Sequence, residues 1–161
     1  MDRGVLVDDR QETNCPGVYA AGDAAQTIDI VYGDKRVNAL WPVAVEQGRV
    51  AALNMGGITA LYPGSLARNA LRIFGISILT AGRGLDEGPN VRRSETADNY
   101  HKIVLERGIL RGFIFIGEVR NEGLYVGMIK SGADVSSYAD SLLRGSYGYG
   151  RHLARSMKIK P

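Results

Sequence analysis

The residues with the clearest chemical potential are Gly22, Asp23 and Ala24, which follow the apolar segment 18–21. We expect residues 18–21 to form a short buried strand that ends at Gly22, because a residue without Cβ lets the backbone turn sharply or approach a ligand. Asp23 then stands at the mouth of the strand, where a carboxylate is suited to accept hydrogen bonds from sugar or sugar-alcohol hydroxyls. Ala24 would begin a helix whose free N–H groups face the same point. The alternative interpretation is a surface turn in which Asp23 caps a helix.

The next element that the sequence clearly predicts is a helix, and it must help to position any ligand that the turn binds. Pro42 suits a first helical turn, and Gly56 and Gly57 supply the stop. Small residues recur along one face of this helix, including Gly48 in its middle. Because a mid-helix glycine costs about 0.5–1 kcal/mol relative to alanine, we expect another backbone or a flat ligand to approach Gly48 closely. Packing of the helix on a sheet would explain the small face equally well.

The pattern of Thr13, Val18-Tyr19-Ala20 and Gly22-Asp23 resembles the second flavin-binding motif of the FAD-dependent pyridine nucleotide-disulfide oxidoreductase family. Both flanks fit: residues 4–8 look like the strand and turn before the motif, and residues 41–52 look like the helix after it. The branch most similar contains rubredoxin reductases, ferredoxin reductases, NADH oxidases and nitrite reductase flavoproteins. The resemblance is strong over about the first third of the chain and looser over the remainder.

This resemblance implies a role for each residue of the motif. Asp23 would hold the ribityl chain of FAD, Gly22 would permit its close approach, and Ala24 would follow at the same edge. Trp41 and Pro42, at the start of the helix, would touch the flavin ring, and the helix dipole would favour the negative charge of the reduced flavin. A tryptophan buried in the core is the alternative for Trp41. No catalytic residue and no metal ligand is carried over.

The chain is too short for the whole family architecture. Its 161 residues compare with two nucleotide-binding domains of roughly 100–150 residues each plus a C-terminal domain. No Gly-x-Gly-x-x-Gly fingerprint is present. We therefore expect an α+β fold in which residues 1–60 are the C-terminal remnant of a Rossmann-like FAD domain. Residues 61–144 would form a small mixed α+β dimerisation or docking domain, and residues 145–161 a basic tail.

The expected elements follow from apolar periodicity and from turn residues. Near the motif they are a strand at 4–7, a polar loop at 8–17 and a helical turn at 24–30. Later in the chain they are a short helix at 65–71, a strand in the second half of 71–80, an exposed loop at 82–99, a hairpin of 100–106 and 109–119, and helices at 121–131 and 135–143.

Other chemistries have little support in the sequence. The single cysteine, Cys15, excludes an internal disulfide and a thiolate cluster, and it favours a cytoplasmic protein. His101 and His152 lie too far apart for metal-ligand spacing, and no Gly-x-Ser-x-Gly elbow is present. No apolar run approaches the roughly 20 residues that cross a bilayer, so no membrane role is expected. The basic segment 141–161 has no nucleic-acid recognition motif, so no nucleic acid is expected as a partner.

The sequence thus predicts the C-terminal portion of an NAD(P)H-dependent FAD oxidoreductase that passes electrons from nicotinamide through flavin to an acceptor. Only part of the FAD site lies in this chain, so the chain alone should be inactive and should bind FAD poorly. The expected partners are the missing N-terminal nucleotide-binding domains, a second copy in a homodimer, and a redox protein as acceptor. The alternative is a non-enzymatic dimerisation or docking module formed by residues 65–143.

Overall fold

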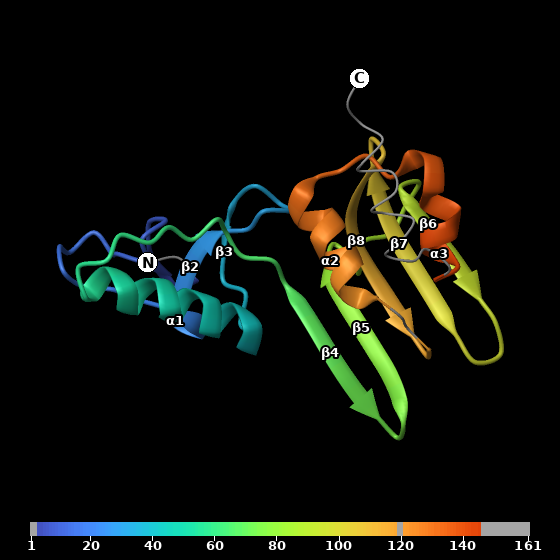
Figure 1. Cartoon of the computed structure of the whole chain (residues 1–161), viewed down its shortest axis with the longest axis horizontal. Coiled ribbons are helices and arrows are strands. Elements are labelled where there is room, and N and C mark those ends of the chain that lie inside the picture. The colour runs from blue at the N-terminus through green and yellow to red at the C-terminus, as the bar shows by residue number, and fades with distance from the viewer. Residues whose placement is uncertain (1–2, 119–120, 146–161) are drawn as a thin grey trace. The chain divides into compact units, whose positions relative to one another are not determined.

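A computed structural model describes residues 3–118 and 121–145 of the chain. The chain divides into two compact units, Met1–Arg68 and Asn69–Pro161, called unit 1 and unit 2 (Figure 1). Each has its own sheet and helices, which confirms the predicted α+β fold. The basic tail predicted at 145–161 lies, apart from Gly145, outside the described residues.

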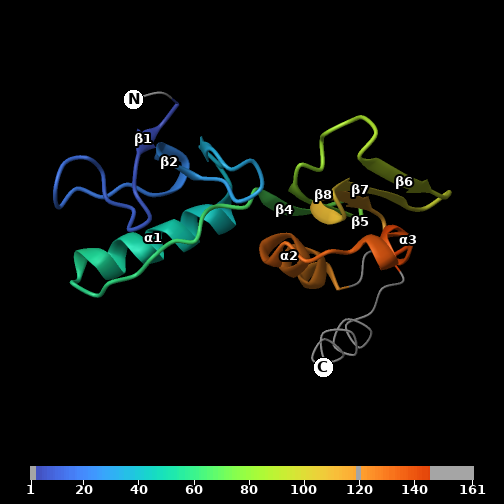
Figure 2. The ribbon, with the colours of Figure 1, turned by 90° about the horizontal axis from the view of Figure 1, so that it is seen from above.

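Unit 1 contains a small mixed sheet and one long helix. Strand β2 (Ala25–Ile28) lies between β1 (Val5–Leu6), to which it is parallel, and β3 (Lys35–Arg36), to which it is antiparallel. Helix α1 (Trp41–Met55) runs along one side of this sheet (Figure 2). It begins and ends where Pro42 and Gly56 predict, and its buried residues, Val43, Gln47, Ala51 and Asn54, recur at intervals of three or four.

Two expectations around the motif are wrong. Residues 24–30 are not helical: Gly22–Ala24 form a 3₁₀ turn, and β2 follows at once. Pairing with β1 and β3 buries Ala25 and Thr27 and outweighs the helix preference of alanine. Residues 18–21 are not a strand either, since only an isolated bridge joins Tyr19 to Glu12. Asp23 therefore precedes a strand rather than ending one.

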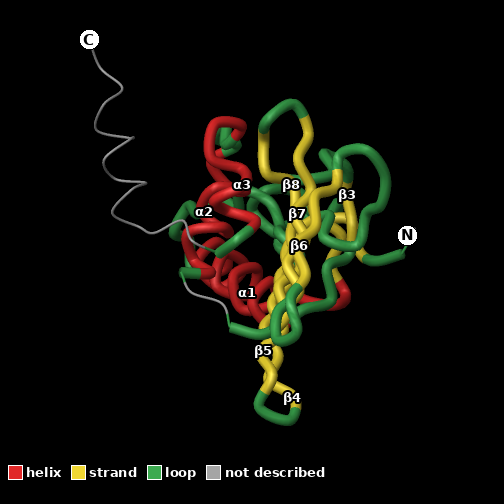
Figure 3. Tube along the Cα trace, turned by 90° about the vertical axis from the view of Figure 1, so that its right-hand side faces the viewer, coloured by secondary structure: helices red, strands yellow, loops and turns green. Residues whose placement is uncertain are grey.

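Unit 2 is a five-stranded sheet with helices on one face. The spatial order is β4 (Arg68–Ile73), β5 (Ile76–Gly82), β8 (Ile109–Ile116), β7 (Tyr100–Glu106) and β6 (Val91–Glu95). The pairs β5–β8, β8–β7 and β7–β6 are antiparallel. Figures 2 and 3 show α2 (Glu122–Ser131) and α3 (Ala139–Leu143) on the same side of this sheet. A 3₁₀ turn at Ser136–Tyr138 precedes α3.

An aromatic cluster forms the core between this sheet and α2. The ring of Tyr125 lies 4.8 Å from that of Phe115, edge on, and 5.6 Å from that of Phe113. The Tyr125 hydroxyl donates a hydrogen bond to the Leu142 carbonyl over 3.1 Å, which ties α2 to α3. Burial and aromatic contact therefore determine how the helices pack on β8.

The structure confirms three predicted elements of unit 2 and corrects three. The strand in the second half of 71–80, the hairpin of 100–106 and 109–119 and the helix at 121–131 are present as β5, β7–β8 and α2, although β8 ends at Ile116. The short helix expected at 65–71 is absent: Ser65 forms an isolated bridge with Asp29, and β4 begins at Arg68. The loop expected at 82–99 contains β6, an outer strand with exposed arginines and no apolar alternation. The helix expected over 135–143 is shorter and follows a 3₁₀ turn.

Candidate cofactor-edge site

The Gly22–Asp23 turn is fastened to the side of α1. Gly22 is buried with φ +75°, and its N–H donates a hydrogen bond to Oε1 of Gln47 over 2.7 Å. A Cβ at this position would lie 3.3 Å from the Cβ of Ala44, in the first turns of the helix. Glycine is therefore needed both for its left-handed backbone and for its small volume.

Gln47 is the residue that holds the turn and the helix together. Its side chain is completely buried, and its Nε2 donates to Oγ1 of Thr27 on β2 over 3.2 Å. One amide therefore connects α1 to the motif turn and to the central strand. The sequence analysis did not single out Gln47. The available signal was a polar side chain on the buried face of the helix, four residues from Val43 and from Ala51.

The motif carboxylate remains available to a ligand. Asp23 and Ala24 are exposed, although the glycine before them is buried. In the part of the chain that the structure describes, no hydrogen bond or ion pair engages the Asp23 carboxylate. An exposed carboxylate on an anchored turn can accept hydrogen bonds without first breaking an internal contact.

The beginning of α1 is also uncovered. Trp41, its first residue, is 82% exposed, so the interpretation that places it in the core of this chain is wrong. Leu40 precedes the helix and makes no side-chain cap, and Pro42 has no N–H to donate. The positive end of the helix dipole is therefore not satisfied by a side-chain cap.

The close approach expected at Gly48 is not made within the described residues. A Cβ built on Gly48 would have no atom within 4 Å, other than its chain neighbours and its own helix. The face that carries Gly48 also exposes Val45 and Met55, so it does not pack on the sheet. Within the described residues the surface of α1 around Gly48 is therefore open, whereas Ala51, another small residue of the helix, is buried.

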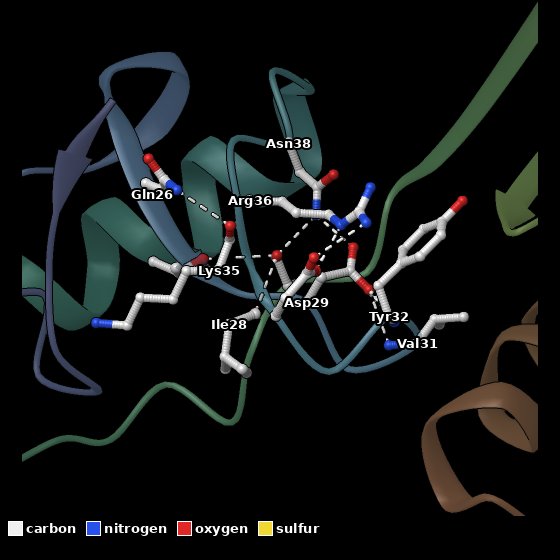
Figure 4. A network of polar contacts seen from close by, with 11 residues as sticks. Gln26, Ile28, Asp29, Val31, Tyr32, Lys35, Arg36 and Asn38 are labelled. Atoms are coloured by element: carbon white, nitrogen blue, oxygen red, sulfur yellow. Dashed lines mark hydrogen bonds and ion pairs between the residues drawn. The ribbon is translucent and has the colours of Figure 1, made fainter. Parts of the chain in front are cut away.

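A buried carboxylate shapes the segment that leads into α1 (Figure 4). Oδ1 of Asp29 accepts the N–H groups of Val31 and Tyr32 over 2.8 and 3.1 Å, and Oδ2 accepts Nδ2 of Asn38 over 2.8 Å. Asn38 also donates to Oγ of Ser65 over 2.7 Å. This network fixes residues 29–38 and hence the direction in which the chain enters the helix. The sequence analysis did not identify Asp29 or Asn38.

The described residues contain no group of three or more His, Cys, Asp or Glu side chains arranged to hold a metal. His101 lies on β7, with Nδ1 2.9 Å from the Leu143 carbonyl oxygen and its ring 4.7 Å from that of Phe115. Over the same part of the chain, no helix is both long and apolar enough to cross a bilayer.

Comparison with known proteins finds a family match over the turn and the first half of α1. Residues 1–48 match the model of the pyridine nucleotide-disulphide oxidoreductase family. The chain is 31% identical over 140 residues to an NAD(P)H nitrite reductase of Bacillus subtilis, covering 84% of this chain and 17% of that protein. It is 35% identical over 118 residues to an NADH-rubredoxin oxidoreductase of Clostridium acetobutylicum, covering 73% of this chain and 30% of that protein.

Solved structures agree with this assignment. The crystal structure of the NADH:rubredoxin oxidoreductase from Clostridium acetobutylicum superposes with a TM-score of 0.65 at 30% identity, covering 89% of this chain and 37% of that one. An FAD-dependent pyridine nucleotide-disulphide oxidoreductase from Desulfovibrio vulgaris has the same fold, with a TM-score of 0.72 at 23% identity, covering 88% of this chain and 39% of that one. The chain spans between 17% and 37% of the length of the first curated relatives that it matches. The sequence match at the motif and the shared fold support the assignment of this chain to a part of a pyridine nucleotide-disulphide oxidoreductase family protein.

Proposed function

We propose that this chain supplies one edge of the FAD site of an NAD(P)H-dependent oxidoreductase. The observation that carries the proposal is the Gly22–Asp23 turn, which Gln47 holds beside the start of α1. This arrangement leaves a carboxylate and a tryptophan exposed on elements that are themselves anchored. The family match covers both the turn and the first half of the helix.

The available groups suit the chemistry of a flavin. The Asp23 carboxylate would accept hydrogen bonds from ribityl hydroxyls, and Gly22 and Ala24 would keep the approach to it free of large side chains. The uncapped start of α1, at Trp41 and Pro42, favours negative charge nearby, and the exposed indole offers a flat apolar surface. FAD, when bound, supplies the redox chemistry by accepting hydride from NAD(P)H and passing electrons onward.

The remaining contacts belong to polypeptide outside this chain. The chain spans between 17% and 37% of the first curated relatives, so nucleotide-binding domains on the N-terminal side would complete the FAD site and bind NAD(P)H. The names of the relatives include rubredoxin and nitrite as substrates, which supports a redox protein or centre as electron acceptor. The single cysteine supports a cytoplasmic location.

A chimeric enzyme tests this proposal. Residues 1–161 replace the matching segment of the Clostridium acetobutylicum NADH-rubredoxin oxidoreductase, and FAD affinity is measured by flavin fluorescence. We expect the chimera to retain FAD and Asp23→Ala to weaken its binding about ten- to hundredfold, because hydrogen bonds to a charged group are lost. Asp9→Ala is the matched control, since Asp9 is an exposed acid of the same unit. Equal FAD affinity in the two variants would refute the role of Asp23.

A second role is favoured by one feature of unit 2. The β4–β5 hairpin exposes Leu71, Ile73, Phe74 and Ile76, a concentration of apolar side chains that is unusual for a free surface. We infer that unit 2 also acts as a dimerisation or docking module, as an addition to the role of unit 1.

A further inference from the structure

A polar cavity lies within unit 2, at the edge of the sheet where β6 and β7 meet α3. Its volume is about 460 Å³, which falls in the range of small-molecule sites, roughly 300–1,000 Å³. The side chains that line it include Ser94 of β6, His101 of β7 and Arg144, which directly follows α3. Helix α3 contacts both strands (Figure 1). All these elements belong to unit 2, so the cavity is independent of the flavin site proposed for unit 1.

His101 contributes an unsatisfied nitrogen to this cavity. The residue is only 8% exposed, and its Nδ1 lies 2.9 Å from the Leu143 carbonyl oxygen, which can only accept a hydrogen bond. In the neutral ring Nδ1 therefore carries the proton, and Nε2 is left as an acceptor. Nε2 is buried and has no hydrogen-bond partner within the described residues. Because buried polar atoms are nearly always hydrogen bonded, Nε2 calls for a donor from a molecule in the cavity.

The groups around His101 are mainly hydrogen-bond donors. Oδ1 of Asn99 accepts the N–H of Glu118 over 2.7 Å, so Nδ2 is the amide atom left for a ligand. Ser94 pairs directly with His101 between β6 and β7, which puts both side chains on the same face of the sheet. In the part of the chain that the structure describes, no hydrogen bond or ion pair engages the Ser94 hydroxyl, Asn99 Nδ2 or the Arg144 guanidinium. An amide N–H and a guanidinium together suit a carboxylate.

Gly145 leaves room beside the imidazole. A Cβ at this position would lie 3.2 Å from Cε1 of His101, the ring carbon next to Nε2. The backbone φ of Gly145 is +65°, so glycine also suits the conformation of the chain there. A larger side chain would therefore narrow the cavity next to the unsatisfied nitrogen.

We propose that this cavity binds a small carboxylic acid that carries an amino or hydroxyl group on the neighbouring carbon. Its carboxylate would accept hydrogen bonds from Arg144 and Asn99, and its amino or hydroxyl group would donate to Nε2 of His101. Glu118 also lines the cavity, and a second carboxylate favours a ligand with a positive charge beside its anion. An α-amino acid should therefore bind more tightly than the corresponding hydroxy acid.

Three acids with the same carbon skeleton test this proposal. L-alanine has an amino group beside the carboxylate, L-lactate has a hydroxyl group there, and propionate has neither. Each is titrated into the isotope-labelled full chain, and the dissociation constant is obtained from NMR chemical shifts. We expect L-alanine and L-lactate to bind in the millimolar range, and propionate at least about tenfold more weakly, because it leaves Nε2 of His101 unpaired. Binding of neither L-alanine nor L-lactate would overturn the site, and equal affinity for all three acids would overturn the role of His101.

Two variants separate the contributions of charge and of the imidazole. Arg144→Gln should weaken the binding of L-alanine about tenfold, because a charged donor is lost. Arg72→Gln is the matched control, since Arg72 is an exposed arginine of β4, at the opposite edge of the same sheet. His101→Phe keeps an aromatic ring against Phe115 and should abolish the preference for L-alanine over propionate. The same NMR spectra show whether each variant is folded. Equal affinity of Arg144→Gln and Arg72→Gln for L-alanine would refute the carboxylate contact.

Discussion

Both the backbone conformation and the side chain of Gln11 are energetically unfavourable in the folded state. It is fully buried, its φ is +65°, and neither its Nε2 nor its Oε1 has a hydrogen-bond partner in the part of the chain that the structure describes. An unpaired buried polar group costs about 1–3 kcal/mol, whereas an apolar group of similar shape costs nothing of this kind. Gln11 therefore lowers the stability of unit 1.

We expect Gln11→Leu to raise the free energy of unfolding of unit 1 by about 1–3 kcal/mol, measured by chemical denaturation. The backbone conformation is equally unfavourable for both side chains, so the comparison isolates the amide. Gln26→Leu is the matched control, because Gln26 is buried with its amide bonded to the Lys35 carbonyl over 3.1 Å and to the Arg3 N–H over 3.3 Å. That variant should be destabilised. A loss of stability in Gln11→Leu as well would show that the amide has a partner in solution.

Tyr125 makes the stability of unit 2 depend on pH in the alkaline range. Burial raises the pKa of its phenol from 10.0 to about 12. The folded state therefore keeps this proton where the unfolded chain releases it, so the contribution is complete below pH 10 and is lost as the pH rises through about 12. We expect the free energy of unfolding to fall across this window. In Tyr125→Phe the fall should be smaller, although the hydrogen bond to Leu142 is lost at all pH values. Parallel pH profiles of the two proteins would contradict this.

Among the elements, those defined by local signals were predictable. Pro42 and the glycines after Met55 mark the limits of α1, and Arg107 and Gly108 mark the turn between β7 and β8. In both cases the information lies within a few residues of the element. The same holds for α2, whose apolar positions outweigh the low helix preference of Gly123 and Gly127.

The elements that were missed depend on partners far away in the sequence. Ala25 and Gln26 are strand residues because β1 pairs with them from twenty positions away, and nothing in the local sequence indicates this pairing. β6 is a strand because β7 pairs with it, and its exposed arginines give no apolar alternation. Local propensity is weak compared with such tertiary contacts.

In the candidate site, too, residues of a local motif were predicted and residues whose role depends on buried hydrogen bonds were missed. The motif identified Gly22 and Asp23 because it is a contiguous pattern, and their roles toward FAD stay predictions. Gln47 and Asp29 escaped notice because their importance lies in buried hydrogen bonds, one of which joins residues 25 positions apart. A buried polar side chain acquires meaning only when its partner is known.

At the scale of the whole molecule, the two units have separate hydrophobic cores, which differ in how much apolar surface they bury. Unit 2 buries a continuous aromatic cluster that includes Phe113, Phe115 and Tyr125. Unit 1 has a smaller buried set and exposes Trp41, Val45 and Met55 along α1. Less apolar burial means less stabilisation per residue, so unit 1 should be the weaker of the two.

We therefore expect calorimetry of the chain to show two unfolding transitions, with unit 1 melting first. Leu66 and Leu110 are both fully buried, one in each unit, and replacing either by alanine should cost about 2–5 kcal/mol. Leu66→Ala should lower only the first transition, and Leu110→Ala only the second. Leu85→Ala, at an exposed site, should move neither. A single transition that both core variants shift equally would mean that the units unfold together. In that case unit 1 would not be less stable than unit 2, and the explanation based on the exposed face of α1 would be wrong.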